Sequence, residues 1–598
     1  MDRFETHEHD VIVIGAGGAG LRAAIEVATQ GARVGLICKS LLGKAHTVMA
    51  EGGVAAALGN VYPEDNWRVH FRDTMRGGKL LNNWRMAMLH AQEAPDRVKE
   101  LEGWGALFDR TTDGRILQRD FAGHRYARLA HVGDRTGLEM IRTLQQHVVS
   151  QGVDVFMECT VTRLLKDGER VSGAFGYWRE SGRFVVFQAK AVVLATGGIG
   201  KAYKVTSNSW EYTGDGHALA YHAGGDLIDM ECVQFHPTGM VWPLSVRGIL
   251  VTEAVRGEGG VLRNAAGERF MFRYVPEMFR ADTAETEAEA DRWYTDKKNN
   301  RRPPELLPRD EVARAIVAEV KAGHGSPHGG VFLDIASRRD ADFIRRKLPS
   351  MYHQFKELAD VDITKQPMEV GPTCHYIMGG IRVDAETAAA TVPGLYAAGE
   401  VAGGMHGSNR LGGNSLSDLL VFGRRAGLAA GEHAKRLERM PAVDPAEVER
   451  LAREMLAPLE RATGENPYAL QAALQEVMEA NAGIVRTEDE LRKGLEAVEE
   501  FRRRLQQVKA VGTRHYNPGW HTALDLWSLL TASEAIIRGA LERKESRGGH
   551  TRLDHPKADP QFGKVNIVIR KEGERMTVRR EPLPEMPQEL KALLEGDK

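Results

Sequence analysis

Cysteine is scarce in this chain of 598 residues, which contains only four. Their scattered positions include no C-x-x-C pair, so the sequence indicates neither a disulfide framework nor an iron–sulfur or zinc site, and we expect no bound metal. If the protein carries out redox chemistry, the electrons must therefore leave through an organic cofactor to an acceptor outside this polypeptide. The four residues are Cys38, Cys159, Cys232 and Cys374.

Long apolar runs and an excess of one charge are also missing. No uninterrupted apolar run approaches the roughly 18 residues of a membrane helix, and the acidic start of the chain lacks the basic and apolar regions of a signal peptide. Lysine and arginine together number 80, and aspartate and glutamate 82, which leaves a net charge of -2. This balance favours neither a nucleic-acid partner nor an anionic membrane surface. We therefore expect a cytoplasmic globular chain without a transmembrane helix.

A dinucleotide-binding pattern is present near the start of the chain. The apolar run DVIVI from residue 10 leads into a glycine motif of Gly15, Gly17, Gly18 and Gly20, and a helical run follows to Gln30. Gly15 permits a tight turn, Gly17 lets the backbone approach a pyrophosphate, and Gly20 lets the helix pack closely on the strand. Strand, turn and helix in this order predict phosphate binding at a helix N-terminus, where unpaired N–H groups face the ligand.

The next strand departs from the pattern of NAD-binding proteins. It covers residues 33–38 and ends in Cys38, Lys39 and Ser40, where an acid for the ribose hydroxyl is expected about 20 residues after the glycines. No carboxylate stands there, so a common NAD site is disfavoured. Lys39 and Ser40 would have to serve the adenosine end of a different dinucleotide, and FAD is the natural candidate.

The rest of the chain predicts an α/β protein with a Rossmann-like FAD-binding domain that is discontinuous in sequence. Apolar runs that end in glycine, at residues 190–198 and 391–400, predict strands of one nucleotide-binding sheet on both sides of an insertion. Within the insertion, the charged residues 281–302 predict a mobile excursion that loops out at the surface. We leave open whether this excursion contacts a partner or has no function.

The second half of the chain changes character at about residue 431. Helical spacing of Glu, Leu, Arg and Ala in residues 447–456, 487–508 and 523–541 predicts a helical bundle. The polar, proline-containing end, with one strand-like run at 565–570, predicts a small appended unit. The predicted domains are residues 1–240 with 363–430 (FAD binding), 241–362 (an inserted α+β capping domain), 431–545 (helical bundle) and 546–598 (C-terminal unit).

A histidine, His46, lies in the glycine-flanked segment GKAHTVMAEGG just downstream of the dinucleotide motif, and it suggests a flavin bonded to the protein. Further motifs follow in order along the chain. Together they closely resemble the flavoprotein subunit of succinate dehydrogenase and fumarate reductase, over essentially the whole chain. The matching segments are HTVMAEGG (46–53), TGDGHALA (213–220), QFHPTG (234–239), TEAVRGEGG (252–260), PRDEVARAI (308–316), GPTCHYIMGG (371–380) and GSNRLGGNSLSDLLVFGRRAG (407–427).

The resemblance implies an enzyme that oxidises succinate to fumarate by hydride transfer to FAD, and that can run in reverse. In this family the histidine that matches His46 carries FAD through a covalent bond to a methyl group of the isoalloxazine. Attachment there withdraws electron density and raises the flavin potential, as oxidation of an unactivated C–C bond requires. The other FAD contacts implied by motif are Thr47, Gly53, Asp215, Glu400, Ser415 and Leu416.

The resemblance also implies a site that grips a four-carbon dicarboxylate at both ends. His375 and Arg410 would bind one carboxylate, and His236 and Thr252 the other, because cationic and hydrogen-bonding groups suit a dianion and arginine matches a carboxylate in two bonds. Phe121 would pack over the substrate. By the same resemblance, Arg309 would take the proton and pass it through Glu253 and Arg256 to solvent.

Partners follow from the resemblance as well. It implies an iron–sulfur subunit that accepts the electrons, one or more cytochrome b-type membrane-anchor subunits, and a quinone that is reached indirectly. The chain would then lie on the cytoplasmic face of the inner membrane, attached through these subunits. The direction of the reaction in the cell, the quinone and the oligomeric state are left open.

Three alternatives compete with this interpretation. A related L-aspartate oxidase or soluble fumarate reductase would share the fold but hold FAD noncovalently, which His46 disfavours. An FAD-containing RNA-modifying or RNA-binding protein could share the first nucleotide-binding unit, but the chain has no basic cluster interleaved with aromatic residues. A binding-only subunit with an inactive site is disfavoured because every catalytic position is occupied.

Overall fold

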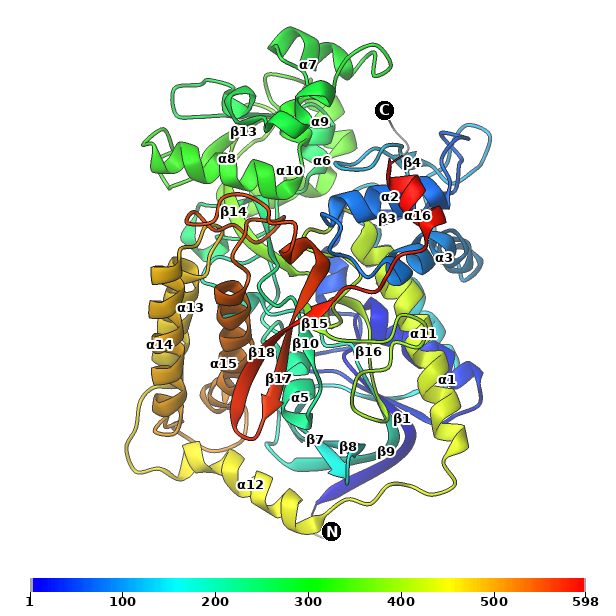
Figure 1. Cartoon of the computed structure of the whole chain (residues 1–598), viewed down its shortest axis with the longest axis vertical. Helices are drawn as coiled ribbons and strands as arrows, with labels where there is room; N and C mark the ends of the chain where they lie inside the picture. The colour runs from blue at the N-terminus through cyan, green and yellow to red at the C-terminus, as the bar shows by residue number, and fades with distance from the viewer. Residues whose placement is uncertain (1–3, 596–598) are drawn as a thin grey trace.

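The computed structural model describes residues 4–595, and its main sheet lies at the bottom centre of Figure 1. The sheet has seven strands in the order β6-β2-β1-β9-β8-β7, with β16 beside β9. β1 pairs in parallel with β2 and β9, and the predicted α/β class is confirmed. The strands are β1 (Glu5–Ile14), β2 (Val34–Ile37), β6 (Asp154–Phe156), β7 (Cys159–Asp167), β8 (Arg170–Trp178), β9 (Phe184–Leu194) and β16 (Leu395–Ala397).

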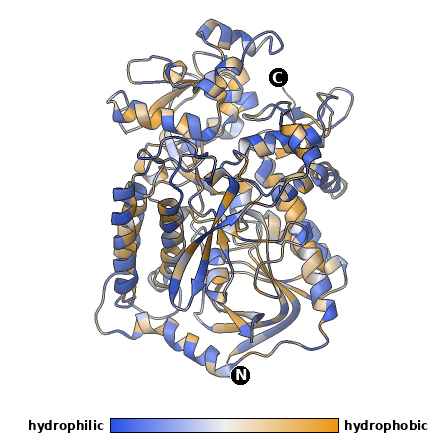
Figure 2. Cartoon of the chain, in the orientation of Figure 1, coloured by the Kyte–Doolittle hydropathy of each residue, from blue (hydrophilic) through white to orange (hydrophobic). Residues whose placement is uncertain are grey.

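Burial explains why these sequences form strands. The VIVI run that ends β1 is buried throughout, as is the end of β9, and such continuous apolar strands occur where a sheet is covered on both faces. Figure 2 shows hydrophobic residues along these strands. Around them lie α2 (Trp67–Gly77), α3 (Trp84–Gly103), α4 (Thr136–Ser150), α5 (Asp215–Ala223) and the small sheet of β3 (Val54–Ala55), β4 (Gln118–Arg119) and β5 (Leu129–Ala130).

The helices α1 (Gly18–Thr29) and α11 (Asn414–Arg436) pack against each other beside the main sheet. Their close approach depends on glycines of α11. A Cβ on Gly423 would lie 2.7 Å from the carbonyl oxygen of Ala19, and one on Gly427 would lie 2.5 Å from that of Ala23. The segment after the insertion is thereby joined to the first glycine-motif helix, and both α11 and α1 begin at the same cavity.

The insertion forms a separate lobe at the top of Figure 1, with its own hydrophobic core. Its antiparallel sheet has the order β11-β14-β13-β12. The neighbouring strands β11 and β14 lie beyond the predicted limits of 241–362, so this sheet is continuous with the flanking segments. The lobe contains β11 (Val233–Met240), β12 (Val261–Arg263), β13 (Val331–Asp334), β14 (Met368–Ile377), α6 (Ala254–Gly257), α7 (Glu287–Trp293), α8 (Arg309–Lys321), α9 (Ala341–Lys347) and α10 (Pro349–Ala359).

The charged segment 281–302 does not loop out as a bare excursion, and that prediction is corrected. It contains the helix α7, which Thr286 caps by accepting a hydrogen bond from the backbone N–H of Glu289 at 3.2 Å. Trp293 at the end of the helix is 6% exposed, so the segment has an apolar anchor within the lobe. The sequence did not predict this anchor, because a single tryptophan gives no periodic pattern among the charged residues.

Four helices form the region at the left and bottom of Figure 1. Figure 2 shows that hydrophilic residues cover most of α14, which buries only Leu491, Gly494, Val498 and Phe501 at helical spacing. The predicted boundary at 430/431 falls inside α11, which continues to Arg436. The helices are α12 (Pro445–Glu460), α13 (Pro467–Asn481), α14 (Glu488–Leu505) and α15 (Pro518–Glu542).

The last segment is an integral part of the fold rather than an appended unit. Its hairpin joins two short strands of the FAD-binding region in the order β15-β10-β17-β18. The final helix packs on α2 with Leu590 in their shared apolar cluster. The elements are β10 (Leu227–Ile228), β15 (Gly380–Ile381), β17 (Val565–Glu572), β18 (Arg575–Pro582) and α16 (Gln588–Glu595). Between residues 4 and 595, no helix is both long and apolar enough to cross a bilayer.

The close packing of the glycine motif makes a testable prediction. A Cβ on Gly20 would lie 1.7 Å from the carbonyl oxygen of Gly15, so Gly20→Ala must push α1 away from β1. We expect the free energy of unfolding to fall by about 3 kcal/mol or more, measured by denaturant unfolding. Gly103→Ala is the control, because a Cβ there meets nothing within 4 Å, and it should change stability by less than about 0.5 kcal/mol. Equal stability of the two variants would contradict this reading of the turn.

Candidate active site

One cavity runs from the glycine motif to the boundary with the inserted lobe. Of the predicted site residues, Gly20 and Arg256 lie outside its lining. Gly20 serves helix packing, as expected from the sequence. The predicted residues that line the cavity are Gly15, Gly17, Gly18, Lys39, Ser40, His46, Thr47, Gly53, Phe121, Asp215, His236, Thr252, Glu253, Arg309, His375, Glu400, Arg410, Ser415 and Leu416.

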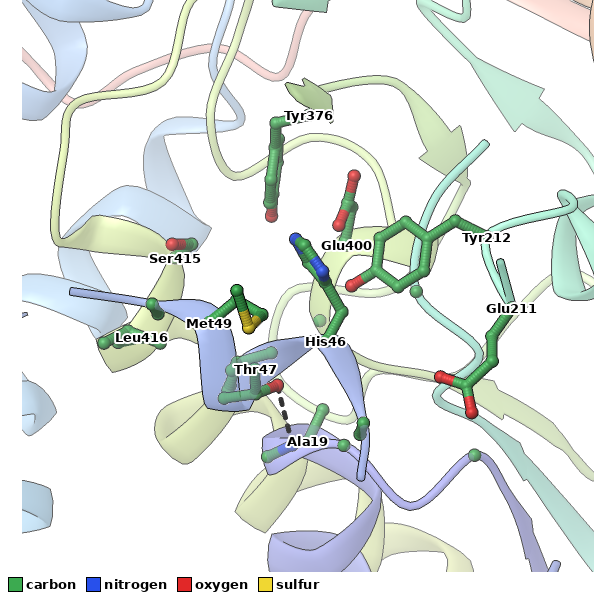
Figure 3. A pocket seen from close by; sticks show the side chains of 18 of the residues that line it. Ala19, His46, Thr47, Met49, Glu211, Tyr212, Tyr376, Glu400, Ser415 and Leu416 are labelled. Atoms are coloured by element: carbon green, nitrogen blue, oxygen red, sulfur yellow. Dashed lines mark hydrogen bonds between the residues drawn. The ribbon is translucent and has the colours of Figure 1, made fainter. Parts of the chain in front are cut away.

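The N-terminus of α1 is open toward the cavity. Gly17 is the N-cap and provides no side chain to pair with the first N–H groups of the helix. A Cβ on Gly17 would meet only Thr47 Oγ1 at 3.4 Å and Ala45 at 3.8 Å, whereas a Cβ on Gly18 would point to Met140 and Leu419. The backbone N–H of Gly18 donates to Thr47 Oγ1 at 3.3 Å (Figure 3). The geometry matches the predicted phosphate site, with Thr47 holding the loop against the helix.

The end of the cavity that we predict to hold adenosine contains a lysine whose three ammonium hydrogens all have protein partners. Lys39 Nζ donates to Thr213 at 2.8 Å, to Asp215 at 2.9 Å and to Asp525 at 2.8 Å. Burial alone would lower the pKa of Lys39, but the two carboxylates outweigh it and raise the pKa. Lys39 lines the cavity as predicted, and its ammonium orients Asp215, so a direct contact between Lys39 and the ligand stays a prediction.

His46 begins the short 3-10 helix η1 (His46–Met49) and points into the middle of the cavity, between Glu400 and Met49 (Figure 3). Its Nε2 lies 3.3 Å from the amide nitrogen of Asn208, and its Nδ1 is buried without a partner. Burial and then the charge of Lys201 lower the pKa of His46 to about 4, so the ring is neutral at pH 7. A neutral imidazole keeps a lone pair on one ring nitrogen, and this is the form that can bond to a carbon electrophile.

Glu400 lies beside His46 on the short 3-10 helix η7 (Gly399–Val401). Its Oε1 accepts from the backbone N–H of Ile377 at 3.1 Å, and Tyr212 is a second partner. Burial raises the pKa of Glu400 to about 8, so its carboxyl group is largely protonated at pH 7. It can therefore donate a hydrogen bond to a ligand.

The other end of the cavity is cationic. Arg309, at the start of α8, and Arg410, in the loop before α11, share one acceptor. Gln234 Oε1 on β11 accepts from Arg309 Nη1 at 3.3 Å and from Arg410 Nη2 at 3.1 Å. Burial, and then the charge of Arg309, lower the pKa of Arg410 to about 10. Two buried guanidinium groups at one acceptor favour an anionic ligand between them.

Two histidines complete this end of the cavity, with ring centres 5.2 Å apart. His236 Nδ1 lies 2.9 Å from the carbonyl oxygen of Thr238, and His375 Nδ1 lies 2.8 Å from Ser207 Oγ. Burial, followed by the charge of Arg309, lowers the pKa of both rings well below the ordinary value. A neutral ring donates to a carboxylate only through the nitrogen that carries its proton, which here must be Nε2. For His236 this agrees with Nδ1 accepting from the backbone N–H of Thr238 at 3.2 Å.

The predicted proton relay is present as a chain of contacts. Arg309 Nε donates to Glu253 Oε2 at 3.0 Å, and Arg256 Nη2 lies 3.8 Å from the same oxygen. Burial would raise the pKa of Glu253, but Arg309 and Arg256 outweigh it and hold the pKa below the ordinary value. Arg256 is 0% exposed and donates to the carbonyl oxygen of Glu305 at 2.6 Å. The prediction that Arg256 leads directly to solvent is therefore wrong for this conformation.

Sequence reasoning missed three residues of the site. Gln234 stands in the QFHPTG motif and Glu51 in HTVMAEGG, so motif position could have identified both. Burial raises the pKa of Glu51 to about 8, and Glu51 bonds Thr252 at the cavity wall. Asp525 comes from α15, 486 residues away from Lys39 in sequence, and no local signal could have found it.

Comparisons with known proteins agree with this geometry. A family model described as FAD binding domain matches residues 10–416, and one described as fumarate reductase flavoprotein C-term matches residues 471–592. The fumarate reductase flavoprotein subunit of Mycobacterium tuberculosis is 37% identical, over 95% of this chain and 96% of that protein. The succinate dehydrogenase flavoprotein subunit of Coxiella burnetii is 36% identical, over 96% of each chain.

Solved structures extend the likeness to the whole fold. Mycobacterium smegmatis Sdh1 in complex with UQ1 superposes with a TM-score of 0.87 at 58% identity, over 99% of this chain and 97% of that one. An E. coli quinol fumarate reductase superposes with a TM-score of 0.89 at 33% identity, over 98% of both chains. The cofactor is FAD, and the open N-terminus of α1 and the unpartnered Nδ1 of His46 fit it.

The Lys39 cluster predicts a long-range effect on FAD binding. Asp525→Asn removes a buried carboxylate 2.8 Å from the ammonium, so Lys39 should pull Asp215 away from the cavity. Hydrogen bonds to charged groups contribute about 1.5–3 kcal/mol, so we expect roughly tenfold or greater weakening of FAD uptake by apoprotein, followed by flavin absorbance. Glu454→Gln is the control, since this half-exposed residue lines a neighbouring cavity and pairs with Arg163 and Arg450 rather than with Lys39. Equal uptake by both variants would show that Asp525 does not act on the cofactor site.

Proposed function

The chain belongs to the family of succinate dehydrogenase and fumarate reductase flavoprotein subunits, and on this premise we propose that it catalyses the interconversion of succinate and fumarate. The observation that carries the proposal is the cavity itself. Arg309, Arg410, His236, His375 and Thr252 converge at one end of an FAD cavity, on elements of both the FAD-binding region and the inserted lobe. Relatives bear both enzyme names, so the proposal covers both directions.

Substrate binding follows from charge and spacing. Arg410 and His375 would hold one carboxylate, and His236 and Thr252 the other, so that the central carbons lie between them. Gln234 holds Arg309 and Arg410 in place through its amide oxygen. Phe121, 7% exposed, closes the apolar side of the cavity and excludes water from the reacting carbons. A monocarboxylate would leave one cationic end unpaired and should bind poorly.

Bound FAD supplies the hydride acceptor for one central carbon of succinate. We assign to Arg309 the removal of a proton from the neighbouring carbon. Guanidinium groups seldom release a proton, so the transfer needs a partner in direct contact. Glu253 is that partner at 3.0 Å from Arg309 Nε, and its carboxylate also accepts from the backbone N–H of Ala122 at 3.0 Å. The double contact holds Glu253 in line between Arg309 and Arg256.

We also propose that His46 bonds to FAD. Support comes from the neutral state of its ring, which keeps a lone pair on one nitrogen, and from its place in the middle of the cavity (Figure 3). Glu211 and Asp215 lie toward the adenosine end, and Ser415 and Leu416 at the start of α11 lie toward the other. The helix that begins at Asn414 would present its N–H groups to the flavin ring.

Partner proteins follow from the same premise. The described cysteines are all buried and dispersed, so they form no iron–sulfur site. Electrons from the flavin must therefore pass to another chain. Solved neighbours include the Sdh1 complex with UQ1 and a quinol–fumarate reductase with menaquinol molecules. We propose two kinds of partner, a cytochrome b-type membrane anchor and an iron–sulfur subunit, which hold the chain on the cytoplasmic face of the inner membrane.

The proton role of Arg309 is tested by Arg309→Ala. Turnover of succinate should fall by about 10²- to 10⁴-fold, the usual contribution of a general acid or base, while the flavin stays bound. Arg314→Ala on the same helix α8 is the matched control, because Arg314 pairs with Asp310 and Glu311 outside the cavity and should keep near-normal turnover. Retained turnover in the Arg309 variant would rule out its assignment.

The covalent bond is tested by His46→Ser and acid precipitation. Flavin should stay with the precipitated wild-type chain and appear in the supernatant for the variant. Because the bond raises the flavin potential, succinate oxidation by the variant should fall much more than fumarate reduction. His433→Asn, at a half-buried histidine outside the cavity, should behave as wild type. Release of flavin from wild-type protein would instead support the noncovalent type of relative, such as L-aspartate oxidase.

A further inference from the structure

Residues 283–302 form a closed strap on the inserted lobe, which includes α7 at the top of Figure 1. Thr283 and Arg302 pair at its base, where the N–H of Ala284 donates to the carbonyl of Arg302 at 2.9 Å. Arg301 lies within the strap and pairs with Glu285 at 2.9 Å and with Glu289 at 2.7 Å. The strap is therefore a defined structure with its own internal ion pairs.

The strap is anchored beside the outer end of the proton relay. The hydroxyl of Tyr294 donates to the carbonyl oxygen of Arg256 at 2.8 Å. Asp291 pairs with Arg269 at 3.0 Å, and Trp293 is buried against the lobe. These contacts fasten the strap to the lobe next to Arg256, the last residue of the relay.

From this anchor the strap reaches a loop of the FAD-binding region, residues 120–124. Lys297 pairs with Asp120, and its ammonium also lies 4.8 Å from the ring centre of Trp293. Arg302 Nη2 donates to the carbonyl oxygen of His124 at 3.3 Å. The strap thus contacts both ends of a five-residue loop across the boundary between the two regions.

The middle of that loop belongs to the active site. Phe121 lies between two glycines, because a Cβ on Gly52 would come within 3.0 Å of its ring and one on Gly412 within 2.4 Å. The next residue, Ala122, donates its N–H to Glu253 Oε1 at 3.0 Å. Any shift of the loop would therefore move the aromatic wall of the cavity and a hydrogen bond of the relay together.

We infer that Lys297 and Arg302 are positioning residues, which fasten the loop of residues 120–124 so that Phe121 and Ala122 meet the substrate and Glu253. The inference rests on the proposed function for its substrate. The Lys297–Asp120 pair is partly exposed, with side-chain exposures of 42% and 25%. Exposed pairs contribute about 0–1 kcal/mol and are screened by salt, so the contact is weak enough to open and close during each turnover.

The test uses the whole enzyme with Lys297→Gln, Asp120→Asn and the charge-swapped pair Lys297→Asp with Asp120→Lys. At low ionic strength we expect each single variant to raise the KM for succinate about two- to fivefold, with a smaller change in kcat. Added NaCl weakens binding of the dianion in every form, so the KM of wild type, which also loses the Lys297–Asp120 pair, should rise more steeply with NaCl than the KM of the single variants. The swapped pair should regain both a low KM and its salt dependence. Arg280→Gln, at an exposed arginine that pairs with Glu277 in the lobe, is the control and should match wild type.

Amide hydrogen exchange of residues 119–125 gives a readout that does not need activity. The single variants should exchange faster in this peptide than wild type or the Arg280 variant, because the N–H of Ala122 loses its fixed partner. Unchanged exchange together with an unchanged KM in Lys297→Gln would overturn the inference. If wild-type enzyme fails to turn over succinate, the proposed function fails instead, and the exchange result still decides the role of the strap.

Discussion

The structure depends on two guanidinium groups buried against one amide oxygen. Removing an arginine from water costs several kcal/mol, and the shared acceptor Gln234 with the nearby carboxylate of Glu253 compensates only part of that cost for Arg309 and Arg410. The cavity therefore keeps an excess of positive charge without ligand. A dianion would complete the pairing, so the same electrostatics that destabilise the free cavity favour substrate binding.

This constraint explains why the site lies between two regions. The participating side chains come from β11, β14, α8 and the loop before α11, which are spread over more than a hundred residues of sequence. The FAD-binding sheet alone supplies the phosphate cradle, and the inserted lobe alone supplies Arg309 and Glu253. In the mechanism we propose, only their apposition gives a reacting pair of carbons a flavin on one side and a proton acceptor on the other.

The surrounding contacts hold the FAD-binding region and the inserted lobe together. The adenosine end is tied to α15 through Lys39 and Asp525, and the substrate end is tied to the inserted lobe through the strap and the loop of Phe121. The first tie is largely buried and lies at the end of the cavity away from the substrate residues. The second is exposed and weak, which suits a boundary that substrate and product must cross.

The sequence by itself determined what local geometry and motif position can specify. The roles of Gly15, Gly17 and Gly20 followed from the sterics of a strand–turn–helix, and the long helices of the second half followed from their periodicity. The tertiary structure decided which side chains meet. Lys39 is saturated by Asp525, Arg256 is sealed from solvent, and a charged segment becomes a strap, because each outcome depends on partners distant in the chain whose contacts leave no periodic signal in the sequence.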